Sequence, residues 1–333
     1  MTNITSIAKA LNISPSTVSR ALKKPEMVSL KTRNLILHEA KAQGYLTEDK
    51  GSVETFKGRD NLIGILVADL NNSFSDQIVS AVQDVAYAHD FVPLIGCTYE
   101  RPAQESKIIR QWQDLGLKGI VAMPTHNFSH LESLFSDLKV VLVDRDLENF
   151  QADKVLDDNF LGMKLALDHL HELGHEKIAV LYGSTNVYTF KARSEAAASI
   201  KSDCELIEIN AVSYEELYMG AFEQLNILFM RDKARRPTAI LASNNAIAAG
   251  CLYAASLKGI TMPQDLSLIA FGDSHWMRFY PTPVSAVRQP VTQMGTKAAY
   301  MLLERIKGNT QEFKTEVLEP MLMPRSSTGQ NVA

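Results

Sequence analysis

The side chains best placed to do chemistry lie near the N-terminus, in the run Ser14-Pro15-Ser16-Thr17-Val18-Ser19-Arg20. Ser14 is a favourable N-cap residue, and Pro15 suits the first helical position, where its missing N–H costs no hydrogen bond. Small hydroxyl groups and one arginine would then share the exposed face of a short helix. Such a face can donate hydrogen bonds to phosphates and to base edges in the major groove of DNA.

Two further short helices are predicted to hold this one in place. The first begins at Thr5 or Ser6, ends at Asn12 and has apolar residues at helical spacing. A third helix begins after Ser29 and ends at Gly44. The inward-facing residues of the three helices are Ile4, Ile7, Ala8, Leu11, Val18, Ala21, Leu22, Ile36, Leu37 and Ala40. We therefore expect an all-α, three-helix helix-turn-helix head over residues 1–46.

The charge distribution supports a nucleic-acid partner. Residues 1–46 contain seven Lys/Arg and two Glu, although the formal net charge of the whole chain is −4. A basic head on an acidic body favours binding of polyphosphate by the head, because neutralising phosphates releases counterions.

The overall composition is that of a globular protein, with 46% hydrophobic and 22% charged residues. No apolar run is long enough to span a membrane and no export signal is recognisable, so a cytoplasmic location is expected. Cys97, Cys204 and Cys251 have no CxxC spacing, so we expect neither a metal site nor a disulfide. We also find no GxGxxG, GxxxxGK[ST], GxSxG or HExxH motif, and therefore predict no enzyme activity and no cofactor.

From residue 61 onward, short apolar runs alternate with helical lengths. Two such series occur, with runs at 62–67, 91–95, 119–122, 140–143, 178–181, 206–209, 238–241 and 266–271. Continuous apolar strands followed by helices predict parallel sheets covered on both faces. The body is therefore predicted to be α/β, with two doubly wound parallel-sheet lobes and a ligand-binding crevice at the carboxyl ends of the strands.

The head resembles that of the lactose-repressor (LacI/GalR) family of bacterial transcription regulators. The matching residues are Ile7-Ala8, Ser14, Ser16-Thr17-Val18-Ser19-Arg20, Leu22, Val28-Ser29, Thr32-Arg33 and Gly44-Tyr45. The resemblance implies that Pro15, Ser16 and Arg20 read bases. It also implies phosphate contacts for Ser14, Thr17, Ser19 and Lys31, and the predicted DNA-binding set is completed by Thr5 and Lys23.

The segment after Tyr45 departs from the family pattern. Relatives usually continue with Arg-Pro-Asn and an Ala-Arg-x-Leu turn that orders on DNA and inserts its leucine into the minor groove. This chain has acidic residues and glycines there, and we expect residues 47–60 to be an atypical linker. Val53 or Phe56 is the alternative candidate for the inserted side chain.

The body resembles the same family, whose effector domains are similar to periplasmic sugar-binding proteins. The matching stretches include 69–74, 143–145, 157–159, 242–244, 263–267 and 287–290. The resemblance implies an effector-binding and dimerisation domain over 61–333, crossed three times between the lobes. The N-lobe is expected at about 61–160 plus 291–320, and the C-lobe at about 161–290 plus 321–333.

The effector contacts implied by the resemblance are Asn72, Phe74, Arg145, Arg193, Asn244, Asp273 and Trp276. Each has an alternative role. Phe74 could be a core residue, the two arginines could form ion pairs, and Asn244 could cap a helix. Trp276 could stack on a sugar ring or anchor an interface.

Two departures in this set bear on the ligand. The chain has Asn244-Asn245 where the family commonly has Asn-Asp, and Gly272-Asp273 where it commonly has two aspartates. Fewer carboxylates beside Arg145 and Arg193 would make the site less negative. We therefore hypothesise an anionic effector, a sugar acid or sugar phosphate, bound by one or both arginines.

Together these features predict a sequence-specific DNA-binding regulator, more often a repressor in this family, that acts on double-stranded DNA as a homodimer at a pseudo-palindromic operator. No apolar heptad repeat follows Pro324, which favours a dimer over a tetramer. A small sugar-like effector would control it, and no membrane partner is expected. The alternative is a sugar-binding protein of the periplasmic type with no DNA role.

Overall fold

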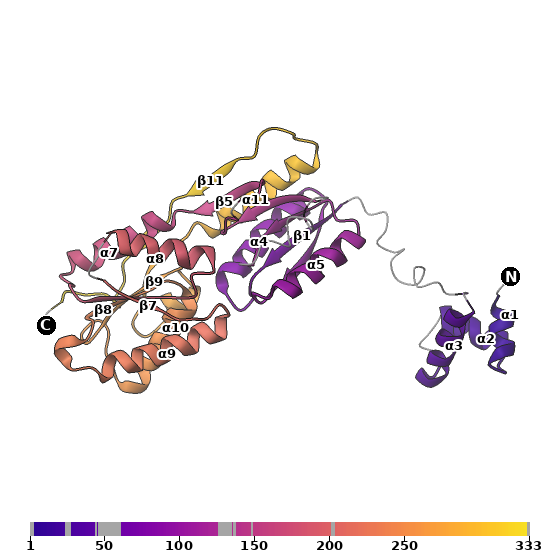
Figure 1. The fold of residues 1–333 in the computed structure, drawn as a ribbon, viewed down its shortest axis with the longest axis horizontal. Helices are drawn as coiled ribbons and strands as arrows, with labels where there is room; N and C mark the ends of the chain where they lie inside the picture. Colours follow the sequence, from indigo (N-terminus) through magenta and orange to yellow (C-terminus); the bar gives the residue numbers. More distant parts are fainter. Residues whose placement is uncertain are drawn as a thin grey trace. The chain divides into compact units, whose positions relative to one another are not determined.

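The computed structural model describes residues 3–23, 28–43, 45, 61–125, 135, 138–147, 149–200 and 204–331. The chain forms two compact units, the head unit, Met1–Arg59, and the body unit, Asp60–Ala333 (Figure 1). The predicted linker at 47–60, with Val53 and Phe56, lies outside the described residues, as does Gly44.

The head unit contains three helices, α1 (Ile4–Ala10), α2 (Pro15–Lys23) and α3 (Leu30–Ala42). They share a small core whose buried members are Ile7, Ala8, Val18, Ala21, Ile36 and Ala40. These six residues are among those predicted to face inward. A short amphipathic helix is marginal alone, so this shared core is what keeps α2 folded.

The start of α1 differs from the prediction. Asn3, not Thr5 or Ser6, is the N-cap, because its Oδ1 accepts a hydrogen bond from Ser6 N at 3.0 Å and Ser6 Oγ accepts one from Asn3 N at 3.2 Å. Thr5 lies inside the first turn. This reciprocal pair is a capping box, here with serine at the third helical position.

The starts of α2 and α3 are as predicted. Ser14 Oγ accepts from Thr17 N at 3.1 Å, and Ser29 Oγ accepts from Thr32 N at 3.3 Å. Asn12, with φ of 53°, adopts the left-handed conformation that ends α1 and turns the chain towards α2.

The first lobe of the body unit, the N-lobe, is built on a parallel six-stranded sheet in the order β11-β5-β4-β3-β1-β2. The strands are β1 (Leu62–Val67), β2 (Val92–Cys97), β3 (Gly119–Ala122), β4 (Lys139–Val143), β5 (Asp153–Asp157) and β11 (Thr315–Leu318). The helices that pack on it include α4 (Ser73–Ala88), α5 (Pro102–Asp114) and α11 (Val291–Ile306).

The second lobe, the C-lobe, has a sheet in the order β12-β10-β9-β8-β6-β7. Its strands are β6 (Ile178–Tyr182), β7 (Glu205–Glu208), β8 (Ala239–Ala242), β9 (Ser267–Phe271), β10 (Ser285–Arg288) and β12 (Met321–Met323). Its helices include α7 (Asn159–Glu172), α8 (Tyr188–Ile200), α9 (Tyr214–Met230), α10 (Asn245–Lys258) and the 3-10 helices η2 (Lys233–Arg235) and η3 (His275–Arg278). Strand β12 runs antiparallel to β10, a departure from the all-parallel expectation.

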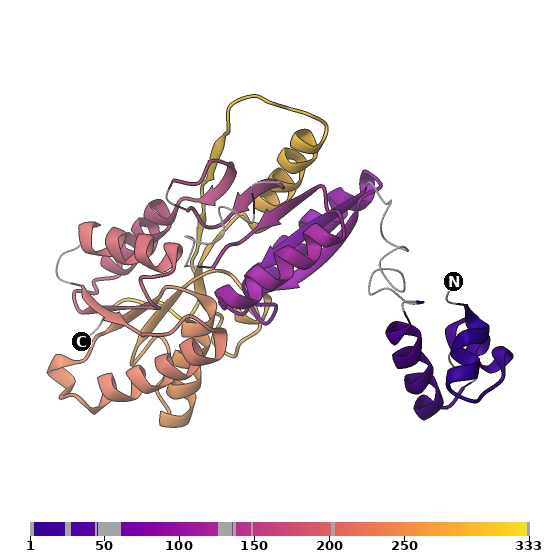
Figure 2. The same ribbon diagram turned by 45° about the vertical axis from the view of Figure 1, so that its right-hand side comes forward.

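Helices cover both faces of each sheet (Figures 1 and 2). In the N-lobe, Ile63, Ile65 and Val67 of β1 pack with α4 and α11, whereas Leu62 and Leu66 pack with α5 on the opposite face. All six residues of β1 are buried. This two-sided burial explains why the strand is continuously apolar, and it confirms the predicted doubly wound architecture.

The chain crosses between the lobes three times, after β5, after β10 and after β11. Because of these crossings, the carboxyl ends of the central strands of both sheets border the same cavity.

The domain limits proposed from the sequence stay a proposal. No helix among the described residues has the length and apolar character needed to cross a membrane.

Candidate functional site

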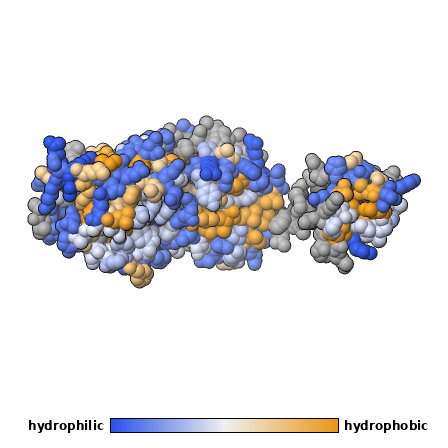
Figure 3. All heavy atoms as spheres, turned by 90° about the horizontal axis from the view of Figure 1, so that it is seen from below, coloured by the Kyte–Doolittle hydropathy of each residue, from blue (hydrophilic) through white to orange (hydrophobic). Residues whose placement is uncertain are grey.

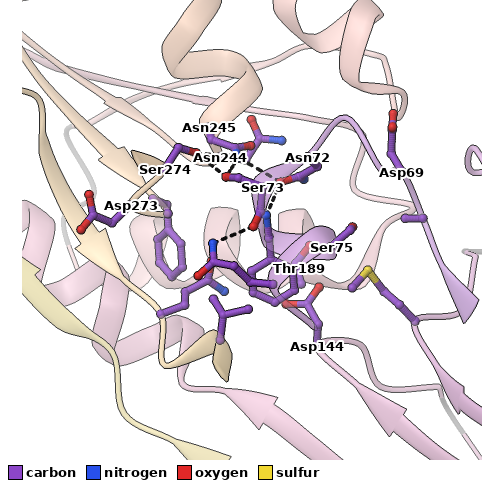
Figure 4. Close-up of a pocket in the computed structure, with 18 of the residues that line it drawn as sticks. Asp69, Asn72, Ser73, Ser75, Asp144, Thr189, Asn244, Asn245, Asp273 and Ser274 are labelled. Atoms are coloured by element: carbon purple, nitrogen blue, oxygen red, sulfur yellow. Dashed lines mark hydrogen bonds between the residues drawn. The ribbon is translucent and has the colours of Figure 1, made fainter. Parts of the chain in front are cut away.

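A cavity of about 300 Å³ lies between the two lobes of the body unit. It is lined by residues that follow the carboxyl ends of strands, including Asn72 after β1, Asp144 after β4, Asn244 after β8 and Asp273 after β9 (Figure 4). Its size lies at the lower end of the range for small-molecule sites in proteins.

Six of the seven predicted effector contacts line this cavity: Asn72, Phe74, Arg145, Arg193, Asn244 and Asp273. Trp276 does not. It lies in η3 with 37% of its surface exposed, edge-on to Tyr280. The structure therefore separates Trp276 from the cavity and leaves the interface role as its remaining prediction.

Two of the predicted contacts cap helices. Asn72 Oδ1 accepts from Phe74 N at 3.0 Å at the start of α4, and Asn244 Oδ1 accepts from Ile247 N at 2.8 Å at the start of α10. The capping alternative for Asn244 is therefore correct. A cap fixes the side chain, so the amide nitrogen of Asn244 is held at the cavity wall as a donor.

Arg145 is held by a carboxylate that the sequence analysis did not identify. Its Nη1 and Nη2 donate to Glu100 Oε2 and Oε1 at 3.0 and 2.5 Å, and Nη1 also donates to Pro124 O at 2.9 Å. Both residues are buried. Burial alone would lower the pKa of Arg145, but Glu100 raises it overall. Arg145 therefore forms the ion pair that was its alternative role, and Glu100 neutralises its charge.

Arg193 is buried and partly engaged. Its Nε donates to Asn159 Oδ1 and its Nη1 to Ser243 O, both at 2.7 Å, and its guanidinium carbon lies 3.8 Å from the centre of the Phe271 ring. Burial lowers its pKa, an effect opposed by Asp144 and Asp157. Arg193 therefore presents a fixed, stacked edge to the cavity rather than a mobile charge.

Asp144 lines the cavity but was not among the predicted contacts. Its φ of 68° is unusual for a residue with a side chain, and such backbone strain is often found at functional sites. Burial raises the pKa of its carboxyl group, against the opposing effects of Arg193 and Arg145. Arg145 Nε is 3.9 Å away, too far for a hydrogen bond. The carboxyl group is available to accept hydrogen bonds from a ligand.

Asp273 has a structural role. Its side chain is 1% exposed and pairs with Arg278, Arg288 and Arg325, and these pairs lower its pKa despite burial. The preceding Gly272 has φ of 98°, a conformation that favours glycine. The carboxylate that the family commonly places before Asp273 is therefore replaced by a tight glycine turn.

A cluster of polar side chains, the inter-lobe cluster, joins the lobes at this cavity. Asn245 Nδ2 in the C-lobe donates to Asn72 Oδ1 at 2.9 Å, to Ser73 Oγ at 3.2 Å and to Ser274 Oγ at 3.0 Å. The two serine hydroxyls are 2.6 Å apart across the lobes (Figure 4). The amide nitrogen, which an aspartate lacks, is the donor in three of these contacts. The substitution noted in the sequence therefore creates a direct link between the lobes.

Two of the chain crossings are also linked through side chains. Asp157 Oδ2, at the end of β5, accepts from Gln289 Nε2 at 3.2 Å, at the end of β10. Its Oδ1 is buried with no hydrogen-bond partner among the described residues. Burial raises the pKa of Asp157 to about 7, although Arg193 opposes this shift. The crossing thus contains a carboxyl group that titrates near neutrality.

The head presents the predicted DNA-binding face. Thr5, Ser14, Pro15, Ser16 and Arg20 are exposed, and Thr17 and Ser19 are partly buried. Lys23 and Lys31 lie in α2 and α3, and their side chains are outside the described part of the structure. Ser14 Oγ lies 2.8 Å from both Ser16 Oγ and Thr17 Oγ1, so these hydroxyls hydrogen-bond one another in the protein alone.

Among the described residues, no cluster of His, Cys, Asp and Glu suits a metal ion.

We predict that Asn245→Asp loosens the inter-lobe cluster. A carboxylate cannot donate to Asn72 Oδ1 and would place a negative charge beside it, at a cost of about 1–3 kcal/mol. The amides near Ser73 and Ser274 should then exchange hydrogen at least about tenfold faster. The exposed Asn210→Asp is the matched control. Unchanged exchange in Asn245→Asp would show that the cluster does not hold the lobes together.

We predict a pH-dependent effect of Asp157→Asn. Because the pKa of Asp157 is about 7 when folded and 3.8 ordinarily, the folded state retains a proton that the unfolded chain has lost at pH values between these two. The contribution of this group to stability therefore falls as the pH rises from about 4 to 7, by at most about 1.4 kcal/mol per pH unit.

Asparagine cannot ionise, so the stability of Asp157→Asn relative to wild type should increase across this range and level off above it. Urea unfolding at a series of pH values measures the difference. Asp114→Asn, at the exposed end of α5, serves as the control. Parallel stability curves for wild type and Asp157→Asn would contradict the prediction.

Comparison with known proteins shows what the chain is similar to. The family described as periplasmic binding protein-like domain matches residues 167–328. The chain is 28% identical to the protein named HTH-type transcriptional repressor PurR of Actinobacillus pleuropneumoniae serotype 3, with 98% of each sequence covered.

Solved structures share the fold of the body unit. A putative transcription regulator from Staphylococcus saprophyticus subsp. saprophyticus has a TM-score of 0.75 at 20% identity, covering 82% of this chain and 100% of that one. A LacI family transcriptional regulator from Enterococcus faecalis V583, solved with bound ribose, has a TM-score of 0.72 at 23% identity, covering 81% and 99%. With its helix-turn-helix head and two-lobed body, the chain is similar throughout to regulators of the lactose-repressor (LacI/GalR) family.

Proposed function

We propose that this protein is a cytoplasmic, sequence-specific DNA-binding repressor controlled by a small sugar-like effector that binds between its lobes. The observation that carries the proposal is the combination, in one chain, of an exposed polar helix face on a basic head and a cavity between two lobes. Relatives named as transcriptional repressors along 98% of the chain support it. The alternative, a sugar-binding protein with no DNA role, does not explain the basic head.

The proposed control works through the relative position of the lobes. An effector changes the equilibrium between two lobe arrangements only to the extent that it binds them unequally, and about 1–3 kcal/mol is usual for such coupling. A dimer reads two half-sites at a fixed spacing, so a change in lobe angle that moves the heads apart weakens specific binding. No catalytic step is needed, and we propose no enzyme activity and no cofactor.

The effector itself is proposed to be neutral and rich in hydroxyl groups. The charged residues lining the cavity are Asp69, Glu100, Asp144, Asp273, Arg145, Arg193, Arg278 and Arg288. Four are acidic and four are basic. Glu100 pairs with Arg145, and Asp273 pairs with Arg278, Arg288 and, from outside the lining, Arg325. The groups left for a ligand, including the amide of Asn244 and the carboxyl of Asp144, suit hydroxyls that both donate and accept. The sugar acid or sugar phosphate expected from the sequence is the alternative.

A thermal-shift screen tests the effector class. Neutral sugars should raise the melting temperature by several degrees at concentrations well above Kd, because a ligand at 100 times its Kd stabilises by about 2.7 kcal/mol. Sugar acids and sugar phosphates should not. Asp144→Asn should reduce the shift, whereas Asp168→Asn, at the half-exposed ion pair with Lys164 on α7, should not. Stabilisation by sugar acids or phosphates alone would overturn the neutral class.

Arg20→Ala tests the DNA-binding role. Arg20 is exposed on α2 and is proposed to contact a guanine in the major groove, a contact worth about 1–3 kcal/mol of discrimination. In mobility-shift assays on operator variants, Arg20→Ala should lose the preference for one base while still retarding DNA. Lys9→Ala removes an equal charge from α1 and should leave the order of preference unchanged. An unaltered preference in Arg20→Ala would show that this side chain does not read a base.

Homodimerisation is proposed from the exposed apolar residues of the body unit. Large apolar side chains are exposed on both lobes, including Ile95 on the edge strand β2, Tyr253 and Leu257 on α10, and Phe279 after η3. Figure 3 shows apolar side chains gathered in patches on one face, between hydrophilic ones. Exposed patches of this kind often mark protein interfaces.

Sedimentation velocity should give a dimer for the wild type and a monomer for Leu257→Asp, because an unpaired charge in an apolar interface is costly. Phe160→Asp is the control, since Phe160 is 53% exposed on α7, which covers the opposite face of the C-lobe sheet from α10. A wild-type tetramer, or a Leu257→Asp dimer, would contradict this arrangement.

A further inference from the structure

A cavity of about 1030 Å³ lies in the C-lobe, away from the cavity between the lobes. It is lined by residues that precede β6, β8 and β9, by the ends of α9 and α10, and by residues 330–331 near the end of the chain. The cavity between the lobes lies at the carboxyl ends of the strands, whereas this one lies at their amino ends. The two cavities are therefore at opposite edges of the C-lobe sheet.

Basic side chains outnumber acidic ones in this cavity, which we call the basic cavity. Its cations are Lys177, Lys233, Arg236 and Lys258, and its anions are Glu176 and Asp265. Asp265 is used by the fold, because its Oδ2 accepts from Thr261 N at 2.8 Å and from Thr261 Oγ1 at 2.6 Å. Within the part of the chain that the structure describes, none of the four cations forms an ion pair. The cavity thus has unpaired positive charge, although the net charge of the chain is −4.

Arg236 presents a fixed pair of donors. Its Nε donates to Arg231 O at 2.8 Å, and its guanidinium carbon lies 5.3 Å from the centre of the Phe229 ring. Its Nη1 and Nη2 donate to no described residue. A guanidinium group oriented in this way can bind a carboxylate through two parallel hydrogen bonds.

Apolar side chains line the same cavity. Phe229, Ile260 and Pro263 are partly buried, and the first two pack on the core of the C-lobe. The three lysines are exposed. An apolar centre with an exposed, polar rim is typical of protein–protein interfaces. A small-molecule site instead encloses most of its ligand and fixes it with a few precisely placed polar groups, which flexible, exposed lysines do not provide.

We propose that the basic cavity docks an acidic segment of a partner protein. A carboxylate of the segment binds the free edge of Arg236, and an aliphatic or aromatic side chain beside it packs on Phe229, Ile260 and Pro263. Further acidic residues of the segment lie near the exposed lysines, where complementary charge increases the association rate and the specificity. The proposal goes beyond the proposed function and does not depend on the effector, because the cavity lies at the other edge of the sheet.

Phage display of random peptides on the immobilised full-length protein tests this proposal. The recovered peptides should include a group rich in Asp and Glu around an aliphatic or aromatic residue. In fluorescence anisotropy, at least one of these should bind Lys233→Glu/Lys258→Glu at least about tenfold more weakly than wild type. Replacing its apolar residue by Ser should weaken binding severalfold. Lys107→Glu, exposed on α5 of the N-lobe, should bind the peptide as wild type does.

Both substituted lysines are exposed, so circular dichroism should show a folded double variant. Failure to recover acidic peptides, or equal binding of every acidic peptide to wild type and double variant, would overturn the docking site. So would an affinity unchanged by loss of the apolar residue, since attraction between charges alone would then explain the binding. Displacement of the peptide by ATP at a comparable concentration would show that the cavity takes small polyanions and would likewise overturn a protein partner.

Discussion

The three crossings of the chain between the lobes are the constraint on which the site depends. Each lobe is a complete doubly wound sheet, yet neither is built from one continuous stretch, because α11 and β11 return to the N-lobe and β12 then returns to the C-lobe. The crossings therefore keep the strand ends of both sheets beside one cavity. Asp157 and Gln289 add a side-chain hydrogen bond between two of them.

Polar groups at the cavity divide into those that hold the protein together and those left for a ligand. The first group contains Asn72, which caps a helix, and Glu100, Arg145 and Asp273, which form ion pairs. Buried charges need such partners, because an unpaired charge in a low-dielectric environment is very costly. The ligand is thus left with a smaller set, chiefly Asp144, Asn244 and one edge of Arg193.

The sequence was sufficient to predict features that arise from local periodicity. The runs that became β1, β3 and β6, the cap at Ser14 and the core of the head all have short-range signals. Strand β5 contains charged residues and β11 is half exposed, so neither resembled a buried strand. Glu100 could not be assigned to Arg145, which is 45 residues away in the sequence, because an ion pair of that kind depends on tertiary structure. Asp144 was recognised as part of a matching stretch, but its strained backbone could not be read from its residue type.

The inter-lobe cluster should also affect the rate at which the lobes separate, in addition to the affinity for a ligand. Asn245 and Ser274 of the C-lobe contact Asn72 and Ser73 of the N-lobe through side chains, and separation of the lobes beside the cavity requires these contacts to break together. The barrier to that event adds to the lifetime of whichever state the protein occupies. In the proposed regulator, release of the effector would be followed by a delay set by the breaking of these bonds, so that brief fluctuations in effector concentration would be averaged.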